Sequence, residues 1–167
     1  MSRVILLCAA ITLLLLSSTR ALYDADSDVV QVTEQTFHEE ILDFPGIVIV
    51  KFYAPWCGEC QYLAPQYDKV ATALKGIVKV AAVDATTAER LSEKHEIEGY
   101  PTIKIFGLNK KKPADYQGEN SATAIIDAAM QTMYLVIKER IAQIGGIGGG
   151  ALRSGISLPN WLSNKFI

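Results

Sequence analysis

The sequence has 167 residues, of which 50% are apolar and 20% are charged, and its formal net charge at neutral pH is −2. This length suits one domain of ordinary size with short appendages, and the composition is that of a globular protein with a buried core. The small net charge gives no electrostatic reason to expect nucleic acid or an anionic membrane as a partner.

The N-terminus has the three-part pattern of a secretory signal peptide. Arg3 gives a positive start, residues 4–16 are almost wholly apolar, and small residues up to Ala21 suit cleavage after that position. The apolar run is shorter than the roughly 20 residues that a membrane span needs, so an uncleaved anchor or a buried helix is the weaker alternative. We therefore expect residues 1–21 to be removed and the mature chain not to contact the membrane. Residues 22–28, acidic and small, are expected to form a loose lead-in.

Strands and helices alternate in the first part of the mature chain. Residues 29–32 predict a short β-branched strand, and a helix over about 35–42 follows, with Thr33 as its cap. After a Pro-Gly turn, residues 47–53 form the most strand-like run of the sequence, apolar on both faces except at Lys51. Such a run predicts a central strand that is covered on both sides.

A second helix is predicted to begin at Cys57 and to stop at Gly76. Pro65 lies inside it and should kink it rather than end it, because the apolar spacing resumes beyond that residue. Residues 77–83 then predict a second buried strand.

The remaining elements are predicted in this order: a helix that ends at about His95, a strand over 102–106, a short strand near Tyr116 and a closing helix over 122–144. Thr86 or Thr87 is expected to cap the first of these helices, and Ser121 the last. The strand over 102–106 alternates in a way that predicts one polar face.

The element order is that of an α/β fold with a mixed β-sheet. We expect a single domain over residues 22–144, with a central sheet flanked by helices. Residues 145–150 are nearly all glycine and predict a flexible spacer, and residues 151–167 form a tail with no clear period.

The cysteines indicate chemistry rather than structural cross-linking. Removal of the signal peptide also removes Cys8 and leaves Cys57 and Cys60, which would close a loop too small to stabilise a fold much. At the start of a helix, unpaired backbone N–H groups and the helix dipole favour the thiolate of Cys57. Cys60 lies one turn further on the same face, from where it can displace a mixed disulfide, and Gly58 lets a substrate chain approach.

A Cys-x-x-Cys pair can have two other uses, as half of a zinc site or as a structural disulfide. Half of a zinc site would need further ligands, but no second cysteine pair exists and His38 and His95 fall in separate predicted helices. An inert structural disulfide is disfavoured because a strand-to-helix turn is a place for a reactive pair. We therefore expect neither a metal nor a cofactor.

Residues 52–60 (Phe-Tyr-Ala-Pro-Trp-Cys-Gly-Glu-Cys) resemble the active-site segment of protein disulfide isomerases, and residues 100–102 (Tyr-Pro-Thr) match the loop that faces this site in that family. The similarity covers roughly residues 22–144 and is greatest to the first thioredoxin domain of the A6-type members. The resemblance implies a thioredoxin fold. It also implies that Cys57 and Cys60 form a redox-active disulfide.

The resemblance further implies how a client chain would be held. Pro101 would be cis and would help to hold an extended substrate chain, as cis X-Pro bonds normally occur in tight turns. Trp56 and Tyr100 would form the apolar surround where unfolded chains bind. Plain packing is the alternative for these two aromatic residues.

Two departures from the family bear on the redox tuning of the pair. The isomerases usually carry histidine where this chain has Glu59, and a carboxylate there should disfavour the Cys57 thiolate and favour the disulfide. If Glu59 points into solvent, screening leaves little effect. Asn120 stands where the family often has an arginine that helps the resolving cysteine to ionise; its alternative is a plain loop residue before Ser121.

Lys51 is the third departure, because the family places a buried carboxylate at this position. A lysine inside an apolar strand is costly unless it is paired or neutral. If burial lowers its pKa, Lys51 could act as a base; if it is charged, it could stabilise a Cys60 thiolate. The third possibility is that its amine reaches the surface along the flexible stem.

The sequence therefore predicts a thiol–disulfide oxidoreductase or isomerase of the secretory pathway that acts on unfolded or disulfide-containing client proteins. The departures suggest a weaker oxidant than a standard isomerase domain. The alternatives are a redox-inactive client-binding chaperone module and a truncated product of a longer multidomain isomerase. The chain ends at residues 164–167 without a retention tetrapeptide, so we expect the endoplasmic reticulum lumen or secretion, and we make no prediction of oligomeric state.

Overall fold

A computed structural model describes residues 22–144; the predicted signal peptide, spacer and tail lie outside these residues. In chain order the elements are β1 (Val30–Val32), the short π-helix η1 (His38–Leu42), β2 (Val48–Tyr53), α2 (Gly58–Leu74), β3 (Lys79–Asp84), α3 (Glu89–Lys94), β4 (Thr102–Phe106), β5 (Ala114–Asp115) and α4 (Ala122–Ile144). The predicted alternation of strands and helices is confirmed.

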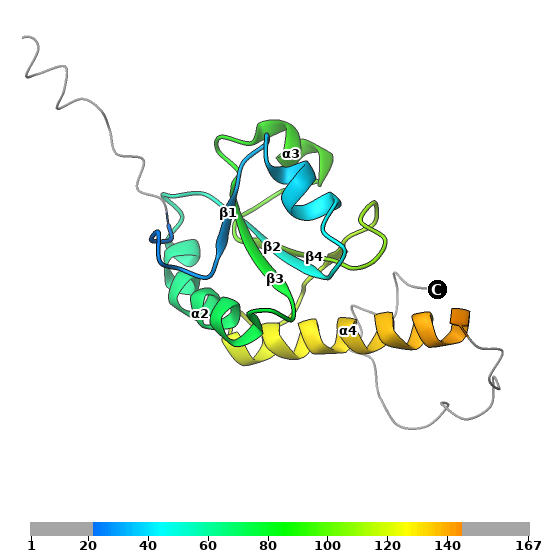
Figure 1. The fold of residues 1–167 in the computed structure, drawn as a ribbon. Coiled ribbons are helices and arrows are strands. Elements are labelled where there is room, and N and C mark those ends of the chain that lie inside the picture. Colours follow the sequence, from blue (N-terminus) through cyan, green and yellow to red (C-terminus); the bar gives the residue numbers. More distant parts are fainter. Residues whose placement is uncertain (1–21, 145–167) are drawn as a thin grey trace, which may run out of the picture.

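The strands form one mixed sheet in the order β1-β3-β2-β4-β5. β3 lies parallel to both β1 and β2, whereas β4 runs antiparallel to β2 and to β5. Helices α2 and α4 cover one face of the sheet, and η1 and α3 cover the other (Figure 1). The predicted α/β architecture with a central mixed sheet is therefore confirmed. No helix within residues 22–144 is long and apolar enough to cross a membrane.

The central strand β2 is buried along its whole length, as its apolar sequence predicts. Its side chains alternate between two hydrophobic clusters, because successive residues of a strand point to opposite faces. Ile49 and Tyr53 belong to the cluster beneath α2, whereas Val50 and Phe52 belong to the cluster on the other face. By this alternation Lys51 lies on the face that α2 covers.

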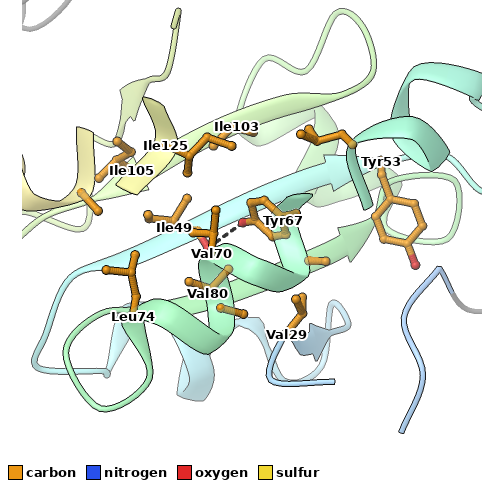
Figure 2. Packing of buried hydrophobic residues seen from close by; sticks show 14 of the residues in the cluster. Val29, Ile49, Tyr53, Tyr67, Val70, Leu74, Val80, Ile103, Ile105 and Ile125 are labelled. Atoms are coloured by element: carbon orange, nitrogen blue, oxygen red, sulfur yellow. Dashed lines mark hydrogen bonds between the residues drawn. The ribbon is translucent and has the colours of Figure 1, made fainter. Parts of the chain in front are cut away.

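Helix α2 is fixed to the sheet by a buried tyrosine. The Tyr67 hydroxyl oxygen lies 3.1 Å from the carbonyl oxygen of Ile49 and 2.9 Å from that of Ala81, so it can donate to either carbonyl. Figure 2 shows Tyr67 reaching from the helix to the strand that carries Ile49. The contact sets how the helix that begins at Cys57 lies over β2.

Tyr67→Phe is expected to destabilise the domain by about 1–2 kcal/mol, because it removes a buried hydrogen bond and keeps the ring. Urea unfolding of the two proteins measures the difference. Tyr62→Phe is a matched control on the same helix, since Tyr62 is 76% exposed. Loss of its hydroxyl should change the free energy of unfolding by less than about 0.5 kcal/mol. Equal effects of the two substitutions would contradict this role of Tyr67.

The first predicted helix is shorter than expected and has a different start. The structure places η1 at His38–Leu42, with Phe37 before it and no side-chain cap. Thr33, the predicted cap, exchanges hydrogen bonds with Thr36: each backbone N–H donates to the other's hydroxyl oxygen, at 3.0 and 3.3 Å. The two threonines close the turn that precedes the helix.

The predicted caps of the third helix are also wrong. Helix α3 follows Ala88, which makes no side-chain cap bond. The Asp84 carboxylate accepts hydrogen bonds from the backbone and the hydroxyl of Thr86, at 2.9 and 2.6 Å, and its carbonyl accepts one from the Thr87 hydroxyl at 3.1 Å. These threonines stabilise the turn after β3 instead.

The polar face predicted for β4 is wrong as well. Lys104 is buried, and its amine donates to the carboxylate of Asp115 on the neighbouring strand β5. Strand β5 covers Ala114–Asp115, so Tyr116, which was predicted to lie in the last strand, follows directly after it. The charge of Lys104 is balanced by a partner from a later segment, which the pattern of β4 itself cannot indicate.

Helices α2 and α4 agree with the prediction from the sequence. Helix α2 follows Cys57 directly and continues through Pro65 to Leu74. Gly76 then adopts a φ of 79°, a conformation that glycine accepts without steric cost. Helix α4 has the predicted bounds, and the Ser121 hydroxyl accepts a hydrogen bond from the backbone N–H of Ala124 at 3.3 Å.

Candidate active site

The two cysteines of the predicted pair lie together at the N-terminus of α2. Their sulfur atoms form a disulfide, and their Cα atoms are 5.2 Å apart. Cys60 is fully buried, whereas Cys57 keeps 9% of its surface exposed. An external thiol or disulfide can therefore reach Cys57 and not Cys60.

The backbone around Cys57 is arranged to favour negative charge on its sulfur. The Cys57 N–H donates to the carbonyl of Ala54 at 3.1 Å, which closes the turn between β2 and α2. Cys57 itself is extended and caps the helix, and its sulfur accepts the backbone N–H of Cys60 at 3.2 Å. A helix N-terminus supplies unpaired N–H groups and the positive end of the dipole to this atom.

A second segment, distant in sequence, faces the pair. The Tyr100–Pro101 peptide bond is cis, as expected, and the carbonyl oxygen of Tyr100 lies 3.6 Å from the sulfur of Cys57. The rings of Trp56 and Tyr100 meet edge to face with 6.1 Å between their centroids. Trp56 is 74% exposed, so plain packing does not account for it, whereas Tyr100 is half-buried and packs against both clusters.

The two residues between the cysteines face open space. A side-chain atom added at Gly58 would meet nothing within 4 Å, so a chain can approach the disulfide here. Glu59 is exposed in the first turn of α2, next to the pair in sequence. Asn120 is an exposed loop residue before Ser121, and its side chain makes no hydrogen bond within the part of the chain that the structure describes.

Lys51 is fully buried, and its amine has no hydrogen-bond partner among the described residues. The amine nitrogen lies 4.7, 5.0 and 5.7 Å from the ring centroids of Tyr23, Tyr67 and Tyr53. Burial lowers the pKa of Lys51 to about 7. The possibility that its amine reaches the surface is therefore wrong.

Comparison with known proteins agrees with this geometry. The thioredoxin family profile matches residues 28–131 of the chain. The chain belongs to the thioredoxin family. Among solved structures, the Trx4 domain of ERdj5 superposes on this thioredoxin domain with a TM-score of 0.56 and 32% identity, over 65% of this chain and 96% of that one. The thioredoxin fold expected from the sequence is confirmed.

Curated relatives carry the name that the sequence resemblance suggested. Protein disulfide-isomerase A6 of Mus musculus is 44% identical over 150 residues, which cover 90% of this chain and 33% of the relative. The protein disulfide-isomerase A6 homolog of Drosophila melanogaster is 50% identical over 113 residues, 68% of this chain and 26% of the relative. The thioredoxin-family chain thus spans about a third or less of the length of these relatives.

The histidines of the thioredoxin domain do not join the disulfide. His38 is exposed in η1, 3.6 Å from a carboxylate oxygen of Asp43. His95 ends α3 and packs against the rings of Phe37, Phe52 and Phe106, on the opposite face of the sheet from the pair. Burial, with the nearby charges of two lysines, lowers the pKa of His95 to about 4. Among residues 22–144 no group of three acidic, cysteine or histidine residues is arranged to hold a metal ion.

Sequence reasoning missed Tyr23, which it assigned to a loose lead-in. The residue is buried, and its ring packs at 6.3 Å on Tyr53 and at 6.2 Å on Tyr67, measured between centroids. Its backbone carbonyl accepts a hydrogen bond from the side-chain amide of Gln31 at 3.1 Å. A large aromatic residue at the start of an acidic segment is the signal that could have indicated this packing.

Proposed function

We propose that this thioredoxin domain is a thiol–disulfide oxidoreductase that acts on disulfide-containing client proteins. The observation that carries the proposal is the position of the Cys57–Cys60 disulfide, at a helix N-terminus and opposite the cis-proline loop, with Cys57 as the accessible sulfur. The name shared by the curated relatives, protein disulfide-isomerase A6, supports it.

In the reductive direction, the Cys57 thiolate attacks a client disulfide, forms a mixed disulfide and releases one client thiolate. The Cys60 thiolate then attacks the sulfur of Cys57, which releases the second client thiolate and restores the Cys57–Cys60 disulfide. Client oxidation is the reverse sequence. Two electrons move between the dithiol and the client in either direction.

The surface around Cys57 suits an extended client chain. Trp56 offers an exposed aromatic face, and Gly58 leaves the approach to the sulfur open. Tyr100, which precedes the cis Pro101, brings its backbone carbonyl to 3.6 Å from the same sulfur. We assign these residues to client binding.

The proposed function is tested by insulin reduction with the mature domain in the presence of excess small-molecule thiol. We expect catalysed precipitation of the insulin chains. The competing function is a redox-inactive client-binding module, which would suppress aggregation of unfolded proteins and leave insulin disulfides intact. That outcome would show that the domain is a client-binding module and not an oxidoreductase.

Glu59 is proposed to make the pair less oxidising, since its carboxylate disfavours a nearby thiolate. We expect the mature domain, equilibrated with glutathione, to have a reduction potential below the roughly −180 mV of protein disulfide isomerase. Glu59→His should raise the potential by some tens of millivolts, a modest change because the side chain is exposed. Glu59→Gln, which removes only the charge, should lie between the two. Equal potentials for the three proteins would contradict a role for this residue.

We also propose a location and a domain organisation. The pattern at residues 1–21 supports entry into the secretory pathway, with the mature domain over residues 22–144 in the endoplasmic reticulum lumen or outside the cell. The profile match over residues 28–131 supports these domain bounds. N-terminal sequencing of the protein secreted by a eukaryotic host checks cleavage after Ala21.

A further inference from the structure

Both segments that meet at the sulfur of Cys57 carry an exposed carboxylate. Glu59 lies two residues after Cys57, in the first turn of α2. Glu98 lies two residues before Tyr100, whose carbonyl oxygen is 3.6 Å from the Cys57 sulfur. Two residues span at most about 7 Å of chain, so Glu59 and Glu98 border the approach to this sulfur.

The protein itself does not neutralise these two carboxylates. Within residues 22–144 the side chains of Glu59 and Glu98 form no ion pair and no hydrogen bond. The next basic residue along α2 is Lys69, about 15 Å beyond Glu59 along the helix. The nearest basic residue before Glu98 is Lys94, in the last turn of α3. The approach to the accessible sulfur is therefore negatively charged.

Basic residues gather at the opposite end of the domain. Residues 110–112 are three consecutive lysines, and the Lys110 amine donates to the carbonyl of Gly46, just before β2. Lys138 of α4 lines the same groove as Lys112. From this end β2 runs towards the disulfide over six residues, about 17 Å. Such a separation of charge turns the end that holds the accessible sulfur towards a positively charged client.

An exposed aromatic ring lies beside Glu59. Tyr62 is exposed on α2, and residues three and four apart in a helix are neighbours on its surface. Tyr62 is therefore next to Glu59 and also next to Gly58, where the approach is open. A guanidinium group that pairs with the Glu59 carboxylate can stack on the Tyr62 ring, and an ammonium group gains less from such a ring.

We propose that Glu59 and Glu98 select clients with basic residues next to the reacting cysteine, and that Tyr62 favours arginine over lysine there. The inference rests on the proposed oxidoreductase function and names its class of client. In the selected step the Cys57 thiolate bonds to one sulfur of the client disulfide, that disulfide breaks, and the other client sulfur leaves with the electron pair as a thiolate. Positive charge on the client offsets the negative charge that the thiolate and the two carboxylates bring together.

The test uses disulfide-linked dimers of a short peptide with a central cysteine, in four versions whose flanking residues are arginine, lysine, glutamine or glutamate. Attack on either sulfur of a dimer gives the same mixed disulfide. All proteins carry Cys60→Ser in the mature chain, which stops the reaction at this stage for mass spectrometry. Each rate is divided by the rate of the same dimer with 2-mercaptoethanol, which removes the intrinsic reactivity of the peptide disulfide. The ratio between two dimers also removes any change in the reactivity of Cys57 itself.

We expect the arginine and lysine dimers to react about 10-fold faster than the glutamate dimer at low ionic strength, with the glutamine dimer between them. At about 1 M salt, where the Debye length is about 3 Å, this preference should fall below about twofold. Glu59→Gln and Glu98→Gln should each lower the preference, and together they should lower it at least about threefold. Glu139→Gln is the matched control and should not change it, because Glu139 is exposed but lines the groove next to Gly107, at the far end of β4.

The arginine and lysine dimers test the role of Tyr62. We expect the arginine dimer to react about two- to fivefold faster than the lysine dimer, which is the factor that a cation–π contact at an exposed ring provides. Tyr62→Ala should remove this difference, whereas Tyr62→Phe keeps the ring and should keep the difference. If the two substitutions have the same effect, the role of Tyr62 is overturned.

The outcomes separate this inference from the function on which it rests. If all four dimers form the mixed disulfide at equal normalised rates, selection by charge is overturned and the oxidoreductase stands. Selection by Glu59 and Glu98 is also overturned if Glu139→Gln lowers the preference as much as their substitutions do, because the preference would then depend on net charge alone. If no dimer forms a mixed disulfide, both the function and the inference fail.

Discussion

Cys57→Ser is expected to reduce disulfide exchange to the background rate, a loss of roughly three orders of magnitude, because it removes the sulfur that clients can reach. Cys60→Ser is expected to have a different result. It leaves Cys57 accessible and removes the buried thiol that resolves the mixed disulfide. The Cys60 variant should therefore accumulate covalent client complexes that the Cys57 variant cannot form.

Insulin reduction and non-reducing gel electrophoresis after incubation with an unfolded client that contains a disulfide measure these two results. Suppression of client aggregation serves as the control for binding, which both serine variants should retain because Trp56 and Tyr100 are untouched. Covalent complexes with Cys57→Ser instead of Cys60→Ser would reverse the assigned roles of the two sulfurs. Unchanged insulin reduction in either variant would exclude the pair as the reactive centre.

The sequence predicted the elements whose signals are local. The apolar run of β2 and the amphipathic pattern of α4 depend on residues within each element, and both were placed correctly. Helix caps have no such local signal, because threonine and serine side chains bond to the backbone in turns as readily as at helix starts. Ser121 caps its helix, whereas Thr33 and Thr86 each stabilise the turn before one.

The state of the two buried lysines could not be derived from the strands that carry them. Lys104 is balanced by Asp115, and Lys51 is covered by Tyr23. Both Asp115 and Tyr23 come from segments outside the strand that carries the lysine. Whether a long side chain reaches water depends on what packs over its end. The same limit applies to the site: the motif identified the cysteines, but their contact with Tyr100 depends on the fold.

Lys51→Met is expected to stabilise the domain, because methionine fills similar space and has no charge to lose on burial. An unfolded lysine has a pKa of 10.5, and burial lowers the pKa of Lys51 in the fold to about 7. At pH 7 the difference opposes folding by about 4 kcal/mol. Allowing for the lost contacts with three tyrosine rings, we expect a net gain of about 2–4 kcal/mol.

The gain should depend on pH in a defined way. The unfolded chain binds a proton that the folded chain does not bind between pH 7 and 10.5, so wild-type stability rises with pH across this window. The advantage of Lys51→Met is therefore full below pH 7 and shrinks towards pH 10.5. Urea unfolding of the disulfide form at pH 6, 7 and 9 measures it, and a constant difference would contradict a neutral buried amine.

Lys104→Met is the matched control, since it removes a buried lysine from the adjacent strand β4. This amine pairs with Asp115, so its loss is expected to destabilise the domain by about 1–2 kcal/mol rather than to stabilise it. Opposite signs for two buried lysines would show that the missing partner, not burial itself, makes Lys51 costly.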